Sequence, residues 1–585
     1  MFSLFKKLGW FFKENWKRYT VSIILLVIVG VLDVLPPRLV GLAIDEIYVG
    51  SLNWDSLTKY IVYLIGIMVI SYGLTYVWMY QLFGGAHLIE RNLRTKLMNH
   101  LTRMTPTFFE KNRTGDLMAR ATNDLQAISV TAGFGILTLV DSSIFMLTIL
   151  ATMCLLVSWK LTLAAILPLP IMAILMQIYG KKIHTKFMKA QDAFGDLNDK
   201  VLESVAGVRV IRAYVQERAD ENNFAEMTED VYKKNLEVAV IDSLFEPTIK
   251  VLVGISYLIG LAYGAYLVFN QSITLGDLVA FNVYLGMLIW PMFAIGELIN
   301  VLQRGNASLD RIQETLDYKE DVVDPFEPIA VDDPARITFS NVQFQYPSST
   351  VPNLDQVKVD LMKGHTLGLV GKTGSGKTTF IKQLLREYPV GDGELSIGGT
   401  LIQHQTKDQV RNWIGYVPQD HILFSRTVRE NILFGHLEAS EEELQRAIEL
   451  ADFSKDVERL PEGLETLVGE KGVALSGGQK QRISIARAVI KNPEILILDD
   501  SLSAVDAKTE ARIIENIRRE RAGKTTIIST HRLSAVQHAE WVLVFDNGQV
   551  IQEGTHEDLI NQPGWYLEQW ERQQVEQSET EEVGV

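Results

Sequence analysis

The sequence predicts a membrane α-helical domain of six transmembrane helices with long cytoplasmic extensions, followed by a cytoplasmic α/β domain. Two observations predict this order. Hydrophobic residues make up 47% of the 585-residue chain and crowd its first half. In the second half, a short apolar strand leads into a glycine-rich loop and then a helix, which is typical of a soluble α/β domain.

The first 18 residues are basic and amphipathic, and they lack the small-residue cleavage site of a signal peptide. We therefore expect residues 1–18 to form an amphipathic N-terminal segment on the cytoplasmic membrane surface.

Residues 19–316 contain the predicted six-helix transmembrane domain, because a helix needs about 20 mostly apolar residues to cross a bilayer. The six apolar stretches are Tyr19–Ile47, Leu57–Leu82, Thr131–Ser158, Leu161–Tyr179, Val238–Phe269 and Val279–Val301. The links on one side are short, whereas residues 84–129 and 180–237 form long polar links with helical periodicity. We therefore expect the helices to continue well beyond the bilayer. Lys and Arg gather before the first span and in both long links, which places both termini and these links in the cytoplasm.

Each long link contains a break in the helical pattern followed by a short amphipathic piece. Pro106 interrupts the first link and Gly207 the second. The aromatic residues beside these breaks are compatible with docking into a groove of another domain. Ordinary surface turns are an equally good interpretation from the residues alone.

Three acidic residues, Asp33, Asp141 and Glu297, fall within or near the predicted spans. Ionisable groups are costly in lipid, so they usually face a cavity or a partner. Contact with cationic substrates and hydrogen bonding between helices both remain open.

Charge and cysteine content exclude some classes of protein. The net charge of −15 argues against nucleic-acid binding, because such proteins carry basic faces. The single cysteine, Cys154, permits neither an intramolecular disulfide nor a cysteine-based metal cluster.

Residues 317–335 are rich in Asp, Glu and Pro, and they form the predicted linker. The nucleotide-binding ATPase domain is expected at residues 336–573, with strands at Arg336–Phe339, Val342–Tyr346 and Leu367–Val370. Residues 574–585 form an acidic tail that we expect to be disordered.

A phosphate-binding loop follows the strand Leu367–Val370 and precedes a predicted helix at Thr379–Leu385. Its residues are Gly371, Lys372, Thr373, Gly374, Ser375, Gly376, Lys377 and Thr378. In this pattern, backbone N–H groups surround the phosphates, the lysine reaches the β- and γ-phosphates, and the threonine hydroxyl binds Mg²⁺. The loop therefore predicts a P-loop ATPase domain.

Further polar motifs follow in order along the same domain. Leu475–Gln479 reads LSGGQ, the apolar run Ile495–Leu498 ends in Asp499 and Asp500, and the run 527–530 leads to His531. A carboxylate at the end of a buried strand is placed to bind Mg²⁺. A histidine at a strand end can sense a γ-phosphate.

This ordered set resembles the nucleotide-binding domain of an ABC transporter, specifically a bacterial type IV multidrug-type exporter half-transporter, and the resemblance covers nearly the whole chain. It implies ATP and Mg²⁺ as cofactors and a Ser501–Asp506 D-loop. It implies that Asp500, His531 and Gln419 act in catalysis and that Thr378, Gln419 and Asp499 hold the metal. The implied nucleotide-binding residues are Tyr346 (against adenine), Gly371, Lys372, Thr373, Gly374, Ser375, Gly376, Lys377, Thr378, Thr379, Ser476, Gly477, Gly478 and Gln479.

In this family, two ATPase domains close head-to-tail, so the signature of each chain completes the ATP site of the other. The two breaks in the long links are coupling helices, and one of them crosses to the opposite ATPase domain. The resemblance thus implies a second half-transporter as partner, the bacterial plasma membrane as location and an amphipathic small molecule as substrate.

Asp500 departs from the family pattern, which has Glu after the metal-binding aspartate. Asp is one methylene shorter, and a displacement of about 1 Å at a reacting centre can cost roughly 10²-fold in rate. We therefore expect slow hydrolysis at this chain's own site and an unlike partner subunit with Glu at the matching position. The alternative is a lipid or lipopeptide flippase of the same architecture, as a heterodimer or as a homodimer.

Overall fold

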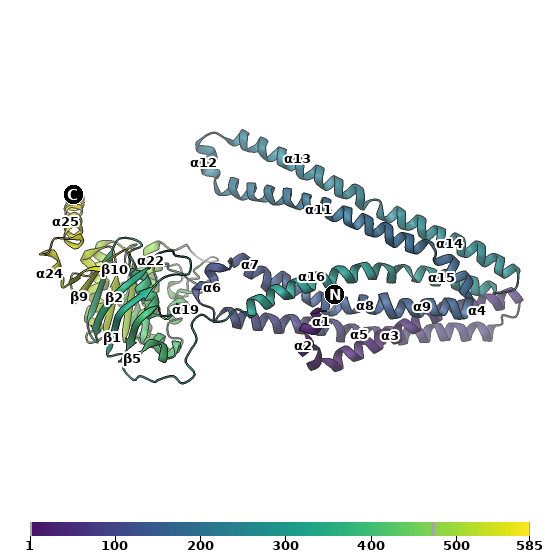
Figure 1. The fold of residues 1–585 in the computed structure, drawn as a ribbon, viewed down its shortest axis with the longest axis horizontal. Helices are drawn as coiled ribbons and strands as arrows, with labels where there is room; N and C mark the ends of the chain where they lie inside the picture. Colours follow the sequence, from purple (N-terminus) through teal and green to yellow (C-terminus); the bar gives the residue numbers. More distant parts are fainter. Residues whose placement is uncertain (1–2, 470–473, 584–585) are drawn as a thin grey trace. The chain divides into compact units, whose positions relative to one another are not determined.

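The computed structural model describes residues 3–469 and 474–583, which divide into two compact units (Figure 1). The first unit comprises residues 1–100 and 115–318, and the second comprises residues 101–114 and 319–585.

The first unit is all helical. Three π-helical turns interrupt its helices, at Arg120–Asp124 (η1), Asp141–Phe145 (η2) and Met153–Ser158 (η3). Its helices are α1 Ser3–Lys7, α2 Gly9–Glu14, α3 Trp16–Asp33, α4 Leu35–Val49, α5 Trp54–Leu101, α7 Thr114–Ala119, α8 Leu125–Val140, α9 Met146–Thr152, α10 Trp159–Ile166, α11 Pro168–Ala206, α12 Val208–Ala213, α13 Glu217–Asp242, α14 Phe245–Phe269, α15 Leu275–Met287 and α16 Ile289–Leu316.

Among the described residues, five helical stretches are long and apolar enough to cross a membrane. They are Trp16–Val49, Trp54–Leu101, Thr114–Ala206, Glu217–Phe269 and Leu275–Leu316. The third has 93 residues and contains two of the predicted spans. Ser158 separates those two, because its backbone is extended (φ −165°, ψ 122°) and its hydroxyl accepts from the Leu161 N–H to begin α10.

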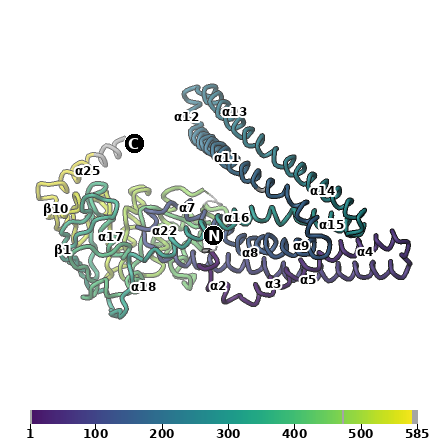
Figure 2. The backbone as a smooth tube through the Cα atoms, turned by 45° about the vertical axis from the view of Figure 1, so that its right-hand side comes forward, coloured from purple at the N-terminus to yellow at the C-terminus, as the bar shows by residue number. Residues whose placement is uncertain are grey.

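The predicted extension of the helices beyond the bilayer is confirmed by α5. This helix has 48 residues, or about 72 Å at 1.5 Å per residue, whereas the hydrocarbon core is about 30 Å thick. Helices α11 and α13 also lie side by side far along their length, and the short α12 joins them at the tip in both views (Figures 1 and 2).

The N-terminal segment folds as the amphipathic pair α1 and α2. Leu4, Leu8 and Phe11 are buried against the first unit, whereas Trp10 is exposed. The Lys96 ammonium lies 3.6 Å from the centroid of the Trp10 ring. The apolar face of this segment is therefore used for packing on the helices.

The second unit contains two sheets. A four-stranded antiparallel sheet has the order β2-β1-β4-β5, and a six-stranded sheet has the order β10-β9-β3-β8-β7-β6, parallel except for β10. The strands are β1 Arg336–Phe344, β2 Leu354–Met362, β3 Thr366–Gly371, β4 Asp392–Ile397, β5 Thr400–Leu401, β6 Ile414–Val417, β7 Ile495–Asp499, β8 Thr525–Ser529, β9 Trp541–Asp546 and β10 Gln549–Gly554. The parallel order brings the carboxyl ends of β3, β8, β7 and β6 to one edge, where ligands of such sheets bind.

Ten α-helices accompany these sheets in the described residues, and one of them comes from the first long link. They are α6 Pro106–Lys111, α17 Lys377–Leu384, α18 Lys407–Trp413, α19 Val428–Leu433, α20 Glu441–Leu450, α21 Ser454–Arg459, α22 Gly477–Val489, α23 Ala507–Glu520, α24 His556–Ile560 and α25 Trp565–Val583. Short 3₁₀ turns lie at Ile402–His404, Gly463–Glu465 and Leu533–Ala535.

Two local expectations were wrong. The strands predicted at Arg336–Phe339 and Val342–Tyr346 form one strand, β1, whose register shifts between Phe339 and Val342. The tail expected to be disordered is helical through Val583 as part of α25. Its Glu and Gln residues are good helix formers, so the helix that starts at Trp565 propagates through them.

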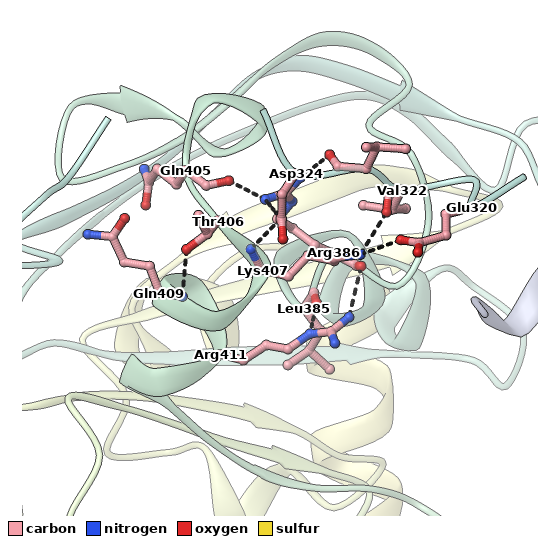
Figure 3. Close-up of polar contacts among 11 residues, drawn as sticks. Glu320, Val322, Asp324, Leu385, Arg386, Gln405, Thr406, Lys407, Gln409 and Arg411 are labelled. Atoms are coloured by element: carbon pink, nitrogen blue, oxygen red, sulfur yellow. Dashed lines mark hydrogen bonds and ion pairs between the residues drawn. The ribbon is translucent and has the colours of Figure 1, made fainter. Parts of the chain in front are cut away.

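The linker after α16 belongs to the second unit and is held there by polar contacts (Figure 3). Arg386 is 3% exposed and donates to the carbonyl oxygens of Gln405 and, at 3.2 Å, Val323. The backbone N–H of Lys407 donates to Asp324 at 2.7 Å, and its ammonium lies 3.1 Å from Glu320. The acidic linker is thus ordered where it meets the ATPase fold.

Candidate ATP site

The phosphate loop has the backbone that close phosphate approach requires. Gly371 and Gly376 adopt φ values of 141° and 115°, which favour glycine. A Cβ on Gly371 would lie 2.2 Å from the Phe545 carbonyl oxygen, so a larger residue cannot fit. The loop ends at Gly376, and α17 begins with Lys377.

Lys377 curls back over this loop. Its ammonium donates to the carbonyl oxygens of Gly371 at 2.8 Å and Lys372 at 2.9 Å. Burial lowers the pKa of Lys377, while the charges of Asp500 and Asp499 oppose the shift. The lysine is therefore a buried cation held at the mouth of the loop by carbonyl groups that a phosphate oxygen can replace.

Ser375 gives an independent indication that the loop fits a phosphate. Its side chain is buried, and its hydroxyl has no hydrogen-bond partner among the described residues. A buried hydroxyl without a partner is costly, and a phosphate oxygen would supply the missing acceptor.

Asp499 ends β7 and is 1% exposed. Its carboxylate accepts from the Thr378 hydroxyl at 3.2 Å and, at 3.5 Å, from the Tyr416 hydroxyl. Burial raises the pKa of Asp499, and the hydrogen bond from Thr378 and the Lys377 charge oppose that shift. One carboxylate beside one hydroxyl fits Mg²⁺, which takes few protein oxygens and completes its shell with phosphates and water.

Asp500 follows in a left-handed conformation, with φ 47°. Its N–H donates to the Ser529 carbonyl at 2.8 Å, and its own carbonyl accepts from the Ser503 hydroxyl at 3.1 Å. These contacts fix the main chain from which the carboxylate extends.

His531 lies just after β8, at the same edge of the sheet. Burial and the Lys377 charge lower the pKa of His531, and the Asp500 charge opposes them. Gln573 on α25 fixes the histidine main chain, because its side-chain amide donates to the His531 carbonyl at 2.8 Å and accepts from the Leu533 N–H at 2.9 Å. The Lys377 and Asp500 charges therefore both act on the His531 side chain.

Gln419 follows β6, whose carboxyl end lies at the same edge of the sheet as those of β7 and β8, and Tyr346 follows β1. Gln419 is exposed two residues after β6, whose Val417 pairs with Leu498 of β7. The Tyr346 hydroxyl donates to Thr379 on α17 at 3.2 Å, so the ring lies beside the phosphate-loop helix. Lys372, Thr373 and Gly374 complete the loop itself.

The LSGGQ segment is separate from these residues and starts α22. Ser476 caps the helix, because its hydroxyl accepts from the Gln479 N–H at 3.3 Å. The Gln479 side-chain oxygen in turn accepts from the Ser476 N–H at 3.0 Å. Ser476 and Gly477 are exposed. The Gly478 position lies against the Ser501–Asp506 loop, because a Cβ there would be 3.1 Å from the Ala504 carbonyl. The exposed helix N-terminus is suited to an anion.

Comparison with known proteins identifies this arrangement. The ABC transporter transmembrane region model matches residues 19–292, and the ABC transporter model matches residues 354–503. A Bacillus subtilis relative named "Probable multidrug resistance ABC transporter ATP-binding/permease protein YheI" is 64% identical, with 98% of each chain covered. The chain belongs to the ABC transporter family.

Two more matches extend this result. An "ATP-dependent lipid A-core flippase" of Syntrophus aciditrophicus is 32% identical over 99% of this chain and 96% of its own length. The structure of "a bacterial Atm1-family ABC exporter with ATP bound" has a TM-score of 0.76 and 26% identity, covering 95% of this chain and 98% of the other. The chain is an ABC exporter with a membrane domain and an ATP-binding domain, it is similar to multidrug ABC exporters, and ABC exporters work as dimers in a lipid bilayer.

Sequence reasoning missed a contact between α6 and Tyr388, which packs against Tyr346. The Tyr388 hydroxyl donates to Glu110 on α6 at 2.5 Å. The Tyr388 ring packs edge-on against Tyr346, with centroids 4.9 Å apart. Phe108 on the same helix is buried, whereas Phe109 is 46% exposed. Docking of these aromatic side chains therefore stays a prediction. No local motif predicts a contact between two residues that are 278 positions apart in the chain.

Proposed function

We propose that this chain is one half of a heterodimeric ATP-driven exporter of amphipathic compounds, and that its own ATP site hydrolyses slowly. Asp500 carries this proposal. Its backbone is held by Ser529 and Ser503, so the main chain cannot advance to make up for the shorter side chain. The attacking water would therefore be poorly positioned.

The remaining predicted site residues take ordinary roles in this proposal. The loop amides and Lys377 bind the ATP phosphates, and Tyr346 packs on adenine. Thr378, Asp499 and Gln419 would hold Mg²⁺, which supplies charge neutralisation on the phosphates when bound. His531 is close enough to the Asp500 and Lys377 charges to respond to the γ-phosphate.

The signature of this chain serves the other subunit in the proposal. Ser476, Gly477, Gly478 and Gln479 form a capped and exposed helix start, so they are available to the ATP held by a partner. Helix α12 also supports a partner, because none of its residues is buried and Val210 and Tyr214 are 60% and 73% exposed. These apolar side chains match the coupling helix that crosses to the opposite subunit in this family.

The partner proposed here is an unlike half-transporter with Glu at the position of Asp500. The protein lies in the bacterial plasma membrane, with both termini and the ATPase domain in the cytoplasm. We also propose that the chain divides into domains and segments at residues 1–18, 19–316, 317–335, 336–573 and 574–585.

The test compares the chain alone with the chain assembled with its partner. We expect ATP binding by the isolated chain, very slow ATP turnover, and a large increase in turnover on assembly. Turnover by the isolated chain at the rate of the assembled transporter would refute the slow site and remove the need for an unlike partner.

A flippase for lipids or lipopeptides is the second candidate, and the 32% identity to a lipid A-core flippase favours it. The two candidates are separated by ligand-stimulated ATPase activity in lipid nanodiscs. Stimulation by amphipathic dyes supports the drug exporter, whereas stimulation by lipopolysaccharide precursors or lipopeptides and not by dyes supports the flippase.

A further inference from the structure

Helix α25 contacts the loop that carries His531, residues 530–533, through one side chain. The Gln573 amide nitrogen donates to the His531 carbonyl at 2.8 Å, and the amide oxygen accepts from the Leu533 N–H at 2.9 Å. Gln573 therefore binds the main chain on both sides of Arg532. These two contacts link the C-terminal helix to the ATP site.

The start of α25 is anchored on the same domain, so Gln573 is held in a defined place. Tyr566 is buried, its N–H donates to the Gln552 side chain on β10 at 3.2 Å, and its hydroxyl lies 2.8 Å from Nδ1 of His556. The Trp570 ring packs edge-on against His556, with centroids 4.6 Å apart. Tyr566, Trp570 and Gln573 follow the spacing i, i+4, i+7, so they lie on one face of the helix.

The opposite side of the loop is held by Arg532. Its guanidinium donates to the carbonyl oxygens of Ser503 and Val505, each at 3.3 Å, and pairs with Glu510, which is 3% exposed. Ser503 and Val505 belong to the Ser501–Asp506 loop. The His531 loop is thus bound to that loop through Arg532 and to α25 through Gln573.

The imidazole of His531 lies where such binding affects chemistry. Burial and the Lys377 charge lower the pKa of His531, whereas the Asp500 charge and a hydrogen bond to the Gly371 backbone oppose that shift. A shift of the main chain would carry the imidazole with it, and a displacement of about 1 Å at a reacting centre can cost roughly 10²-fold in rate. A contact that fixes the His531 main chain can therefore influence the rate of hydrolysis without touching ATP.

A purely structural role would explain one of the two contacts. Leu533 is 0% exposed, and a buried N–H needs a partner. The second contact is different, because it holds the carbonyl of the residue whose side chain has to meet the γ-phosphate. It is made by a long side chain 42 positions further along the chain, whose ordering costs conformational entropy.

We propose that Gln573 is a positioning residue for ATP hydrolysis at this chain's own site, and that α25 acts through it to hold the His531 imidazole toward the γ-phosphate. Gln573 would act through the main chain of residues 531–533 rather than through contact with ATP. This inference rests on the role proposed above for His531, and it does not depend on Asp500 or on the identity of the partner.

The test measures single-turnover ATP hydrolysis by the assembled transporter in nanodiscs, with the partner's catalytic carboxylate changed to an amide. Gln573→Met removes both hydrogen bonds and keeps an unbranched side chain of similar length. The rate at saturating ATP should fall about 5- to 10-fold, while the Kd of a fluorescent ATP analogue changes less than about 2-fold. Gln574→Met is the matched control, because Gln574 is the exposed neighbour on the same helix, and it should leave both values at those of the wild type.

His531→Ala then shows whether the effect passes through the histidine. This variant should be slow, and adding Gln573→Met should lower its rate by less than about 2-fold, because two residues that act through one group are not additive. An equal loss of rate from Gln573→Met with His531 present and with His531 removed would mean a structural contribution only, and would overturn the positioning role.

The same variants separate this inference from the function on which it rests. A slow His531→Ala together with Gln573→Met at the wild-type rate would overturn the role of Gln573 and leave that of His531. His531→Ala at the wild-type rate would remove the proposed role of His531 itself, and the positioning role of Gln573 with it.

Discussion

Replacing Asp500 by Glu should accelerate hydrolysis at this chain's own ATP site. The substitution adds one methylene, which extends the carboxylate by about 1.5 Å, the length of a carbon–carbon bond. The backbone cannot already supply this reach, because the Asp500 N–H donates to Ser529 at 2.8 Å and the preceding Asp499 is in register with Ser529 in the sheet.

The size of the effect follows from this distance. A displacement of about 1 Å at a reacting centre can cost roughly 10²-fold in rate, which equals about 2.7 kcal/mol of transition-state stabilisation at 1.36 kcal/mol per factor of ten. We therefore expect Asp500→Glu to raise turnover at this site by about 10- to 100-fold.

The assay must isolate this site from the one on the partner. The partner's catalytic carboxylate is first changed to an amide, and steady-state ATPase activity is then measured for the wild-type chain, Asp500→Glu and Asp500→Asn. The Asn variant keeps the length of Asp and removes its charge, so it should be no faster than wild type. The affinity for ATP, measured with a fluorescent analogue, should stay within about 2-fold in all three.

One result would refute this reasoning. If Asp500→Glu binds ATP normally and still turns over at the wild-type rate in the silenced complex, then the reach of the carboxylate does not limit this site. Another feature of the site would then have to make it slow.

Three further predictions concern the same unit. Asp499→Asn should raise the melting temperature of the nucleotide-free protein, because burial raises the pKa of Asp499 and so disfavours its charged form. Thermal melting should show the largest gain at neutral pH and a smaller gain as acidification protonates the wild-type carboxyl. The variant should also lose the stabilisation that Mg²⁺ and ATP give the wild type. Arg386→Ala should cost about 2–4 kcal/mol of stability in chemical denaturation of the intact transporter, since it breaks a buried hydrogen-bond network; Asp324→Ala should cost less than about 1 kcal/mol, because that carboxylate is 40% exposed and 3.5 Å away. Tyr388→Phe keeps the ring against Tyr346 and removes the hydroxyl that donates to Glu110, so ATP affinity should stay within about 2-fold while less dye is transported per ATP. Tyr388→Ala should weaken ATP binding by up to about 10-fold, the worth of an edge-on aromatic pair. Equal transport per ATP in wild type and Tyr388→Phe would contradict a role for the hydroxyl.

The phosphate loop was predictable because its chemistry is local. Gly371 and Gly376 need special backbone angles, and Lys377 and Thr378 follow at fixed offsets, so the spacing alone indicates the loop. The roles of Asp499 and His531 needed the order of the motifs, since an acid or a histidine at a strand end is common. The parallel order of β3, β8, β7 and β6 then explains why motifs far apart in sequence meet at one edge.

Long-range contacts were not predictable, because no local spacing pattern marks the residues that make them. The hydrogen bond between Glu110 and Tyr388 joins residues 278 positions apart, and neither residue belongs to a spacing pattern. The break at Pro106 indicated that a short amphipathic piece was present, but not the surface that it contacts. Similarly, Asp33 and Asp141 were visible as acids in apolar stretches, whereas the cavity that they share depends on how six helical segments pack.

Buried charge is informative about ligands only when it borders open space and an unpartnered polar group lies beside it. Arg521 is buried, yet it donates to the backbone carbonyls of Pro493, Glu494 and Thr525, which accounts for its charge structurally. Lys377 likewise donates to carbonyls, but it does so at the mouth of a loop that also holds the unpartnered hydroxyl of Ser375. The carboxylates of Asp33 and Asp141 also border open space, but Asp33 is exposed and Asp141 accepts from the Trp290 indole N–H. Lys377 is thus assigned to an anionic nucleotide by the loop that surrounds it and by the unpartnered Ser375 hydroxyl, and not by its burial alone.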